Sequence, residues 1–248
     1  MVLLNVNPPS IIEEAEEINE EIVDGIAMPP SNLYSDEPPL ETDLHRRQIE
    51  LLIRLLEYWW SGRPNFYISG NLTVYYNQQQ IKSRDFRGPD IFVVLDTEKK
   101  DRRSWMVWDE GGKYPNLVIE LLSNSTEKVD RGLKKQLYQD VWRVPNYFWF
   151  HPETLEFKGF HLVDGKYQAI APNDLGLLWS DQLELFLGIN PQGKLRWYIA
   201  AGDIIPLPEE QERLEKDRER QAKEQAQQKL EKMEAILRSQ GIDPDQVL

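Results

Sequence analysis

The stretch PNLVIELL at residues 115–122 determines how the centre of this chain folds. It is a short run of Leu, Val and Ile bounded by proline, which is typical of a strand buried on both faces. A second run of this kind, GPDIFVVL, occupies residues 88–95. Each run carries one carboxylate, Glu120 in the first and Asp90 in the second. An ionised carboxylate on a buried strand is costly unless it is paired or bound to a metal, so we predict a metal site at Asp90 and Glu120.

Apolar periodicity on either side predicts strands interleaved with two long helices. The first helix begins at Thr42 or Asp43 and runs to Trp59. The second is expected from residues 125–126 to Val141, and its core-facing stripe is Val129, Leu133, Leu137 and Val141. Further strands are expected at residues 65–69, 72–76, 147–150, 155–162 and 166–170, the last two joined by an Asp-Gly turn. This order predicts an α/β or α+β fold with a mixed β-sheet flanked by helices.

Composition divides the chain into three parts. Residues 1–30 are rich in Pro and Glu and are expected to form a solvated acidic arm, although Ile12, Ile18 and Ile22 would alternatively let a short helix dock on the core. Residues 31–205 form the predicted folded domain, and residues 206–248 a charged helical tail. Leu230, Met233 and Leu237 keep heptad spacing in this tail, so weak coiled-coil pairing into a homodimer is a further hypothesis.

The net charge of −13 is unevenly distributed. Residues 1–43 carry 11 acidic and no basic side chains, residues 209–248 carry 11 acidic and 8 basic, and the rest carry 20 acidic and 21 basic. The neutral centre permits a locally positive cleft but argues against avid nonspecific DNA binding. No apolar run is long enough to span a membrane, the N-terminus lacks the pattern of a secretory signal, and cysteine is absent. We therefore expect a cytoplasmic protein with no disulfide or thiolate metal site.

The carboxylate pair suits metal-dependent phosphodiester hydrolysis, which needs hard oxygen ligands, an activated water and a cation near the developing charge. Asp90 and Glu120, with a main-chain carbonyl just after Glu120, would be the ligands. Side chains alternate along a strand, so residue 122 points the same way as Glu120, and a lysine there would complete the usual arrangement. Because that residue is Leu122, the cation must come from elsewhere.

The second predicted helix offers a substitute cation. Asp130, Lys134 and Tyr138 are spaced i, i+4, i+8 and form one stripe beside the apolar one, so Lys134 can reach over the strand ends. Lys135 lies further around the helix and is expected to be more exposed. The alternative for Lys134 is an ordinary helix-surface pair with Asp130.

These elements together resemble the "putative restriction endonuclease" family, which is greatly expanded in cyanobacteria and belongs to the PD-(D/E)XK nuclease-like superfamily. The resemblance covers residues 35–200 and rests on an ordered set of motifs: GPD (88–90), PNLVIELLSNST (115–126), DRGLK (130–134), Tyr138, VPNYFW (144–149) and Pro152. It implies a restriction-endonuclease-like fold with Asp90 and Glu120 as ligands of Mg²⁺ or Mn²⁺ and Lys134 as a lysine migrated to the helix. Asn124 departs from the proline usual in the family.

Two hypotheses about function follow. The first is a divalent-metal-dependent endonuclease acting on nucleic acid, with DNA as the expected substrate. The second is a catalytically idle protein that keeps the fold as a nucleic-acid- or protein-binding module, with the acidic arm or the tail engaging a partner. The structural alternatives for the two carboxylates are that Asp90 starts a strand and caps a turn, and that Glu120 forms a buried pair with an arginine. His45 lies at a position where family members often have histidine, so it is a candidate functional residue. The alternative is a structural role at the end of the first helix. An assembly role for the helical tail is compatible with either.

Overall fold

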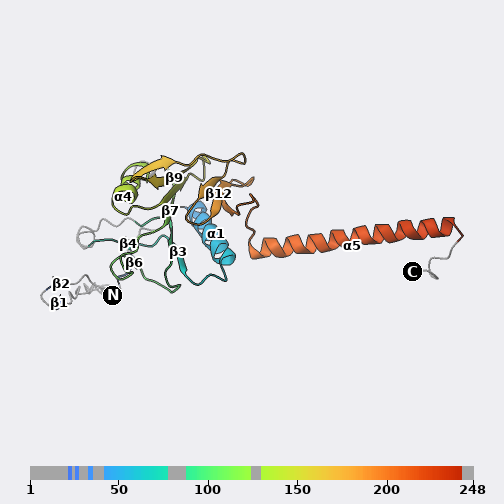
Figure 1. The fold of residues 1–248 in the computed structure, drawn as a ribbon, viewed down its shortest axis with the longest axis horizontal. Helices are drawn as coiled ribbons and strands as arrows, with labels where there is room; N and C mark the ends of the chain where they lie inside the picture. Colours follow the sequence, from blue (N-terminus) through green and yellow to red (C-terminus); the bar gives the residue numbers. More distant parts are fainter. Residues whose placement is uncertain are drawn as a thin grey trace, which may run out of the picture.

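The computed structural model describes residues 33–35, 42–77, 88–123 and 130–241, together with the backbone of residues 22–23 and 26–27. Its centre is a six-stranded mixed sheet (Figure 1). The strands lie side by side in the order β10 (Lys166–Ala169), β9 (Phe157–Val163), β8 (Asn146–Phe150), β7 (Leu117–Leu121), β5 (Ile91–Leu95) and β3 (Phe66–Gly70). Only β7 and β8 run parallel among these neighbours. The predicted α+β architecture with a mixed sheet is confirmed.

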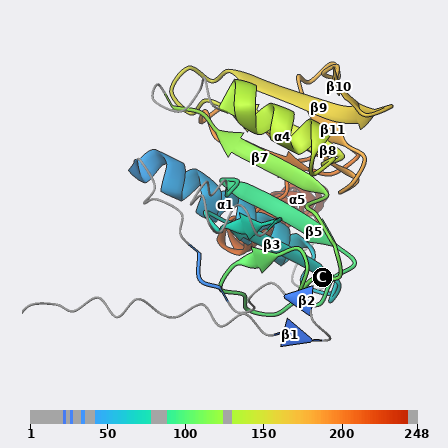
Figure 2. The same cartoon turned by 90° about the vertical axis from the view of Figure 1, so that its left-hand side faces the viewer.

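Side chains alternate between the two faces of the sheet, and each face has its own core. In β5, Ile91 and Val93 pack on the face that carries the buried leucines of α1 (Asp43–Trp59), whereas Phe92 and Val94 pack on the opposite face. The central strands β5, β7 and β8 are therefore covered on both sides, which explains their continuous apolar runs. Helix α1 crosses the β3 end of the sheet, and α4 (Lys135–Asp140) lies toward β10 (Figure 2).

Local sequence signals account for the element boundaries at two places. Thr42 is the N-cap of α1, since its side chain accepts the main-chain N–H of His45 at 3.3 Å. The β9–β10 hairpin turns at Asp164 and Gly165, which both adopt positive φ, as an Asp-Gly turn requires. The sequence predicted both features.

A second, three-stranded antiparallel sheet was not predicted. It consists of β11 (Leu178–Ser180), β12 (Leu185–Ile189) and β13 (Leu195–Tyr198) and packs on α1. The side chain of Gln48 bonds both main-chain groups of Leu195, and the indole N–H of Trp197 donates to the carbonyl of Leu52 at 3.0 Å. These strands are stabilised by contacts with a helix that lies more than 100 residues earlier in the sequence. Local periodicity therefore predicts them poorly.

Two short strand pairs lie outside these two sheets. β4 (Val74–Tyr75) pairs in parallel with β6 (Trp105–Met106), and β1 (Ile22–Val23) pairs with β2 (Ile26–Ala27). Ile22 thus lies in a strand and not in the docking helix that was one alternative for the arm; residues 12 and 18 lie outside the described residues. None of the described helices combines the length and the apolar character needed to cross a bilayer.

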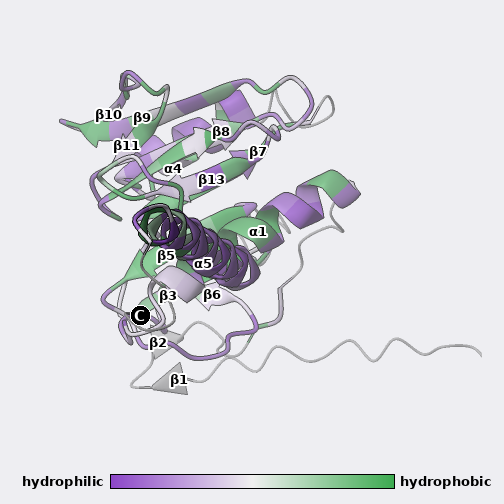
Figure 3. Ribbon diagram, turned by 90° about the vertical axis from the view of Figure 1, so that its right-hand side faces the viewer, coloured by the Kyte–Doolittle hydropathy of each residue, from purple (hydrophilic) through white to green (hydrophobic). Residues whose placement is uncertain are grey.

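The tail forms α5 (Pro208–Ser239), a single helix that extends away from the sheet (Figure 1). None of its residues is buried, and most of its residues are hydrophilic (Figure 3). Its first turn is tied to the domain by ion pairs from Arg196 to Glu210 at 2.7 Å and from Arg54 to Glu209 at 3.3 Å. The predicted helical tail is present in the described residues.

Candidate active site

Asp90 and Glu120 lie opposite each other at one end of the antiparallel pair β5–β7. Ile91 pairs with Ile119, so Asp90 and Glu120 occupy the next position outward and point to the same face of the sheet. The main-chain N–H of Leu121 donates to Oδ2 of Asp90 at 2.7 Å, and the N–H of Asp90 donates to Oε2 of Glu120 at 3.3 Å. These cross-strand bonds hold the two carboxylates side by side.

The segment that follows β7 brings a cation and a phenol to Glu120. The part that the structure describes from residue 130 onward is one π-helical turn, η1 (Asp130–Lys134), which leads directly into α4. Nζ of Lys134 lies 3.1 Å from Oε2 of Glu120 and 3.0 Å from Oδ1 of Asp130. The hydroxyl of Tyr138 donates to Oε1 of Glu120 at 2.5 Å. The i, i+4, i+8 stripe therefore lies over the carboxylate pair.

The predicted core-facing stripe of this helix is wrong. Leu133 and Val141 are 63% and 48% exposed, and only Leu137 is partly buried against the core; residue 129 lies outside the described residues. The polar stripe faces inward because the fully buried carboxylate of Glu120 would cost several kcal/mol without a cation. The observed phase also buries the aromatic rings of Tyr138 and Trp142, so the segment gains apolar packing together with the ion pair.

The electrostatics of the site follow from burial and from the excess of carboxylates. Burial, together with the adjacent charge of Asp90, raises the pKa of Glu120 to about 8, although Lys134 and Tyr138 favour its ionised form. Burial likewise raises the pKa of Asp90. Burial disfavours the charged form of Lys134, but the carboxylates of Glu120, Asp90 and Asp130 outweigh it and raise the pKa of this lysine. When all four groups are ionised, three negative charges surround one positive charge.

This arrangement fits a hard divalent cation held by few protein ligands. Asp90 and Glu120 supply carboxylate oxygens, and their unbalanced negative charge favours a bound cation. Within the described ranges, no cluster of three or more His, Cys, Asp or Glu side chains could hold a metal ion. Mg²⁺ typically binds through one or two carboxylates and keeps several waters, so two ligands match its chemistry.

Other residues considered from the sequence lie outside this contact set. Leu122 is fully buried in the core on the Tyr138 side of the sheet. His45 bonds the hydroxyl of Thr42 through Nδ1 at 2.8 Å, as a residue of the α1 cap. Nζ of Lys135 sits 3.6 Å from the ring centre of Phe160 and not on the carboxylates.

The residue spacing indicated no role for Tyr138 and only a pairing role with Lys134 for Asp130. The structure makes both part of the site, and Tyr147 supports it by donating to the main-chain oxygen of Asp130 at 3.0 Å. The i, i+4, i+8 spacing was the available signal. It could not show which face of the helix is buried.

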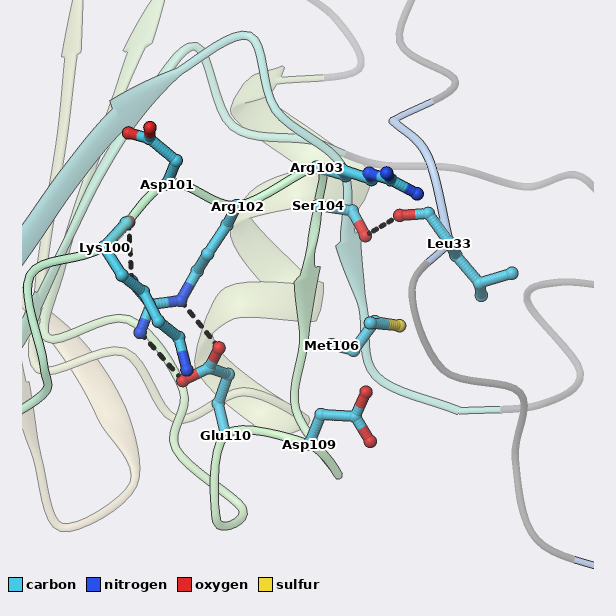
Figure 4. Close-up of a pocket in the computed structure, with 9 residues that line it drawn as sticks. All are labelled: Leu33, Lys100, Asp101, Arg102, Arg103, Ser104, Met106, Asp109 and Glu110. Carbon is cyan, nitrogen blue, oxygen red and sulfur yellow. Dashed lines mark hydrogen bonds and ion pairs between the residues drawn. The ribbon is translucent and has the colours of Figure 1, made fainter.

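A separate cavity of about 390 Å³ lies at the connection between β5 and β7, away from the carboxylates (Figure 4). Its most buried charged side chain is Arg102, which pairs with both oxygens of Glu110 at 2.6 and 3.0 Å and stacks over the rings of Tyr67 and Trp105. Because this guanidinium is fully engaged, we assign it a structural role in closing the loop.

The mixed sheet with a carboxylate pair and a nearby lysine defines a nuclease-like class of protein. Residues 15–200 match the model of the Uma2 family, described as "Putative restriction endonuclease", and the chain belongs to this family. This confirms the resemblance identified from the motifs.

Two individual proteins are also similar. The chain is 33% identical over 107 residues to "Uncharacterized protein slr1290" of Synechocystis sp.. The aligned stretch covers 43% of this chain and 51% of that protein. The chain thus spans about half the length of this curated relative. The crystal structure of a putative nuclease belonging to DUF820 from Anabaena variabilis superposes with a TM-score of 0.43 and 11% identity, over 65% of this chain and 80% of that chain.

Proposed function

We propose that this protein is a divalent-metal-dependent nuclease that hydrolyses phosphodiester bonds of nucleic acid, with DNA as the substrate. Asp90 and Glu120 would hold Mg²⁺ or Mn²⁺, and Lys134 would be the catalytic cation. The observation that carries the proposal is the placement of Lys134 Nζ 3.1 Å from Glu120, at the carboxylate pair. The missing strand lysine at position 122 is thereby replaced from the neighbouring helix.

Each side chain has a distinct role in this proposal. A bound metal would lower the pKa of a coordinated water and offset charge on the phosphate. Lys134, held protonated by Glu120 and Asp130, would stabilise the negative charge that develops on the phosphate oxygens. Tyr138 is a positioning residue, because its hydrogen bond fixes the orientation of the Glu120 carboxylate.

The test is cleavage of labelled duplex DNA, single-stranded DNA and RNA by the purified chain, with and without Mg²⁺ or Mn²⁺. We expect cleavage that requires metal and is abolished by Asp90→Asn and by Glu120→Gln, both of which keep the side-chain size. Lys166→Gln serves as the control, since this exposed lysine pairs with Asp140 away from the site. Full activity of the Glu120→Gln protein would reject the proposed centre.

The idle binding module is the second candidate, and Leu122 favours it because the usual lysine of the strand is absent. Binding of Mn²⁺ separates the two proposals. A nuclease requires Mn²⁺ or Mg²⁺ binding that is lost in Asp90→Asn, whereas an idle module can bind nucleic acid with no metal dependence.

We also propose the boundaries of the catalytic unit, its location and its mode of self-association. We assign the catalytic unit to residues 31–205, and a nucleic-acid substrate suits a cytoplasmic location. A homodimer through the last turns of α5 is supported by the exposed Leu230 and Met233. Leu237 completes their heptad spacing.

A further inference from the structure

A row of side chains crosses the sheet from the carboxylate pair toward β9. Glu120 pairs with Trp149 across β7–β8, and Trp149 pairs with Lys158 across β8–β9, so all three side chains point to one face. Lys158 is 57% exposed. Strands lie about 4.8 Å apart, so Lys158 is two spacings, about 10 Å, from Glu120. This separation corresponds to a rise of about three base pairs along duplex DNA.

Two more cations approach this row from the helical segment. The guanidinium of Arg131 lies 5.4 Å from the ring centre of Trp149, and Nζ of Lys135 lies 5.3 Å from the same ring. We refer to Arg131, Lys135 and Lys158 as the cationic cluster. It flanks the carboxylate pair on the β9 side.

The cationic cluster has more positive charge than its acidic neighbour can balance. Glu156 accepts two bonds from Arg131, at 2.9 and 2.6 Å, and lies 3.6 Å from Nζ of Lys158. Among the residues that the structure describes, no carboxylate forms an ion pair with Lys135. Burial and the charge of Lys158 lower the pKa of Lys135, so an anion placed between them would relieve an existing repulsion.

The kind of anion that the cationic cluster can bind depends on which of the nearby side chains are accessible to a ligand. Trp149 is only 5% exposed, so its ring is not available for stacking on bases. The ammonium groups of the exposed Lys158 and the half-buried Lys135 are accessible, and ammoniums contact phosphates as point charges and carry no base readout. The cluster therefore suits the backbone of a polyanion whose scissile phosphate lies at Asp90 and Glu120.

We propose that Lys135 and Lys158, beside the Arg131–Glu156 ion pair, bind the phosphate backbone of nucleic acid on the β9 side of the scissile bond, without reading base sequence. The proposal rests on the proposed nuclease function. It adds a defined path for the substrate across β8 and β9.

The experiment measures binding separately from cleavage. Fluorescence anisotropy of a labelled DNA duplex is recorded with the full chain over a range of NaCl concentrations, with Ca²⁺ in place of Mg²⁺. We expect Lys158→Gln and Lys135→Gln each to weaken binding and to reduce the slope of log K against log salt by about 0.9. The loss should be the same for duplexes of unrelated sequence.

Two variants provide matched controls. Lys166→Gln, an exposed lysine at the opposite end of the β9–β10 hairpin, should leave affinity and slope unchanged. Glu156→Gln should raise the affinity, because it removes the carboxylate that pairs with Arg131 and Lys158. Far-UV circular dichroism and the thermal midpoint confirm that each variant is folded.

The outcomes separate the two proposals. If the wild-type chain binds the duplex but the Lys135→Gln/Lys158→Gln double variant matches Lys166→Gln, the cluster is rejected and the nuclease proposal stands. If affinity falls for some duplex sequences only, backbone-only recognition is rejected. If the wild-type chain binds no nucleic acid even at low salt, both proposals fail.

Discussion

The hydroxyl of Tyr138 donates a 2.5 Å hydrogen bond to Oε1 of Glu120, while Nζ of Lys134 contacts the other oxygen, Oε2, at 3.1 Å. Each oxygen of this buried carboxylate therefore has its own donor from the same helical segment. The orientation of Glu120, and with it any metal coordination, depends on how η1 and α4 pack over the sheet.

Replacing Tyr138 by phenylalanine should lower the free energy of unfolding by about 1–3 kcal/mol, because a buried acceptor loses its partner. Urea denaturation measures this change. The matched control is Tyr167→Phe, whose hydroxyl donates to the neutral carbonyl of Val144 at 3.0 Å. An equal or smaller loss in Tyr138→Phe than in the control would contradict a stabilising hydrogen bond from Tyr138 to Glu120.

Lys134 and Lys135 should differ in kinetic effect. Lys134→Gln should reduce kcat by about 100-fold or more, as expected when a donor to developing charge is removed. Its effect on KM should be smaller. Lys135→Gln should instead raise KM and leave kcat nearly unchanged, because Lys135 contacts the Phe160 ring on the proposed substrate path and not the carboxylates. The reverse pattern in steady-state kinetics would show that the catalytic lysine is wrongly assigned.

The stability of the metal-free protein should fall as pH rises from about 4.5 to about 8. In this range the unfolded chain has released the Glu120 proton, whose ordinary pKa is 4.5, while the folded chain retains it because the pKa of Glu120 is raised to about 8. The folded state binds more protons, so the free energy of unfolding decreases with pH. Glu120→Gln should have a flatter profile by urea denaturation at several pH values; an identical profile would show that Glu120 titrates normally.

Metal binding should show the opposite pH dependence. A divalent cation binds the ionised carboxylate, so Mn²⁺ affinity should increase as pH rises toward about 8, and binding should release protons. Calorimetry in buffers of different ionisation enthalpy measures the released protons. Affinity that is constant from pH 6 to pH 8 would rule out the raised pKa as the controlling factor.

Deleting residues 1–30 should raise nucleic-acid affinity, most strongly at low ionic strength. Residues 1–43 carry 11 acidic and no basic side chains, so this segment repels or competes with a polyanion. The control is deletion of residues 209–248, whose 11 acidic and 8 basic side chains nearly balance. That deletion should change self-association in sedimentation experiments more than DNA binding. Equal affinity of the full and arm-deleted chains at low salt would reject electrostatic screening by the arm.

The sequence alone determined the strands that carry the carboxylates. Continuous apolar runs bounded by proline and glycine indicate doubly buried strands, and β5 and β7 are such strands with Asp90 and Glu120 at one end. The boundaries of α1 and the β9–β10 turn also follow from local chemistry, because a threonine cap and an Asp-Gly turn act within a few residues.

Only the tertiary structure decided the phase of the helix that covers the site. Periodicity favoured Leu133 and Val141 for the core, but both are exposed while Tyr138 and Asp130 are buried. The inward face carries the lysine and the hydroxyl that contact the buried carboxylate of a distant strand, and it also buries the aromatic ring of Tyr138. The β11–β13 sheet was likewise decided by its contacts with α1, such as the bond from Trp197 to Leu52. Interactions between residues far apart in sequence leave no local periodic signal, because their energies depend on which surfaces meet in the folded chain.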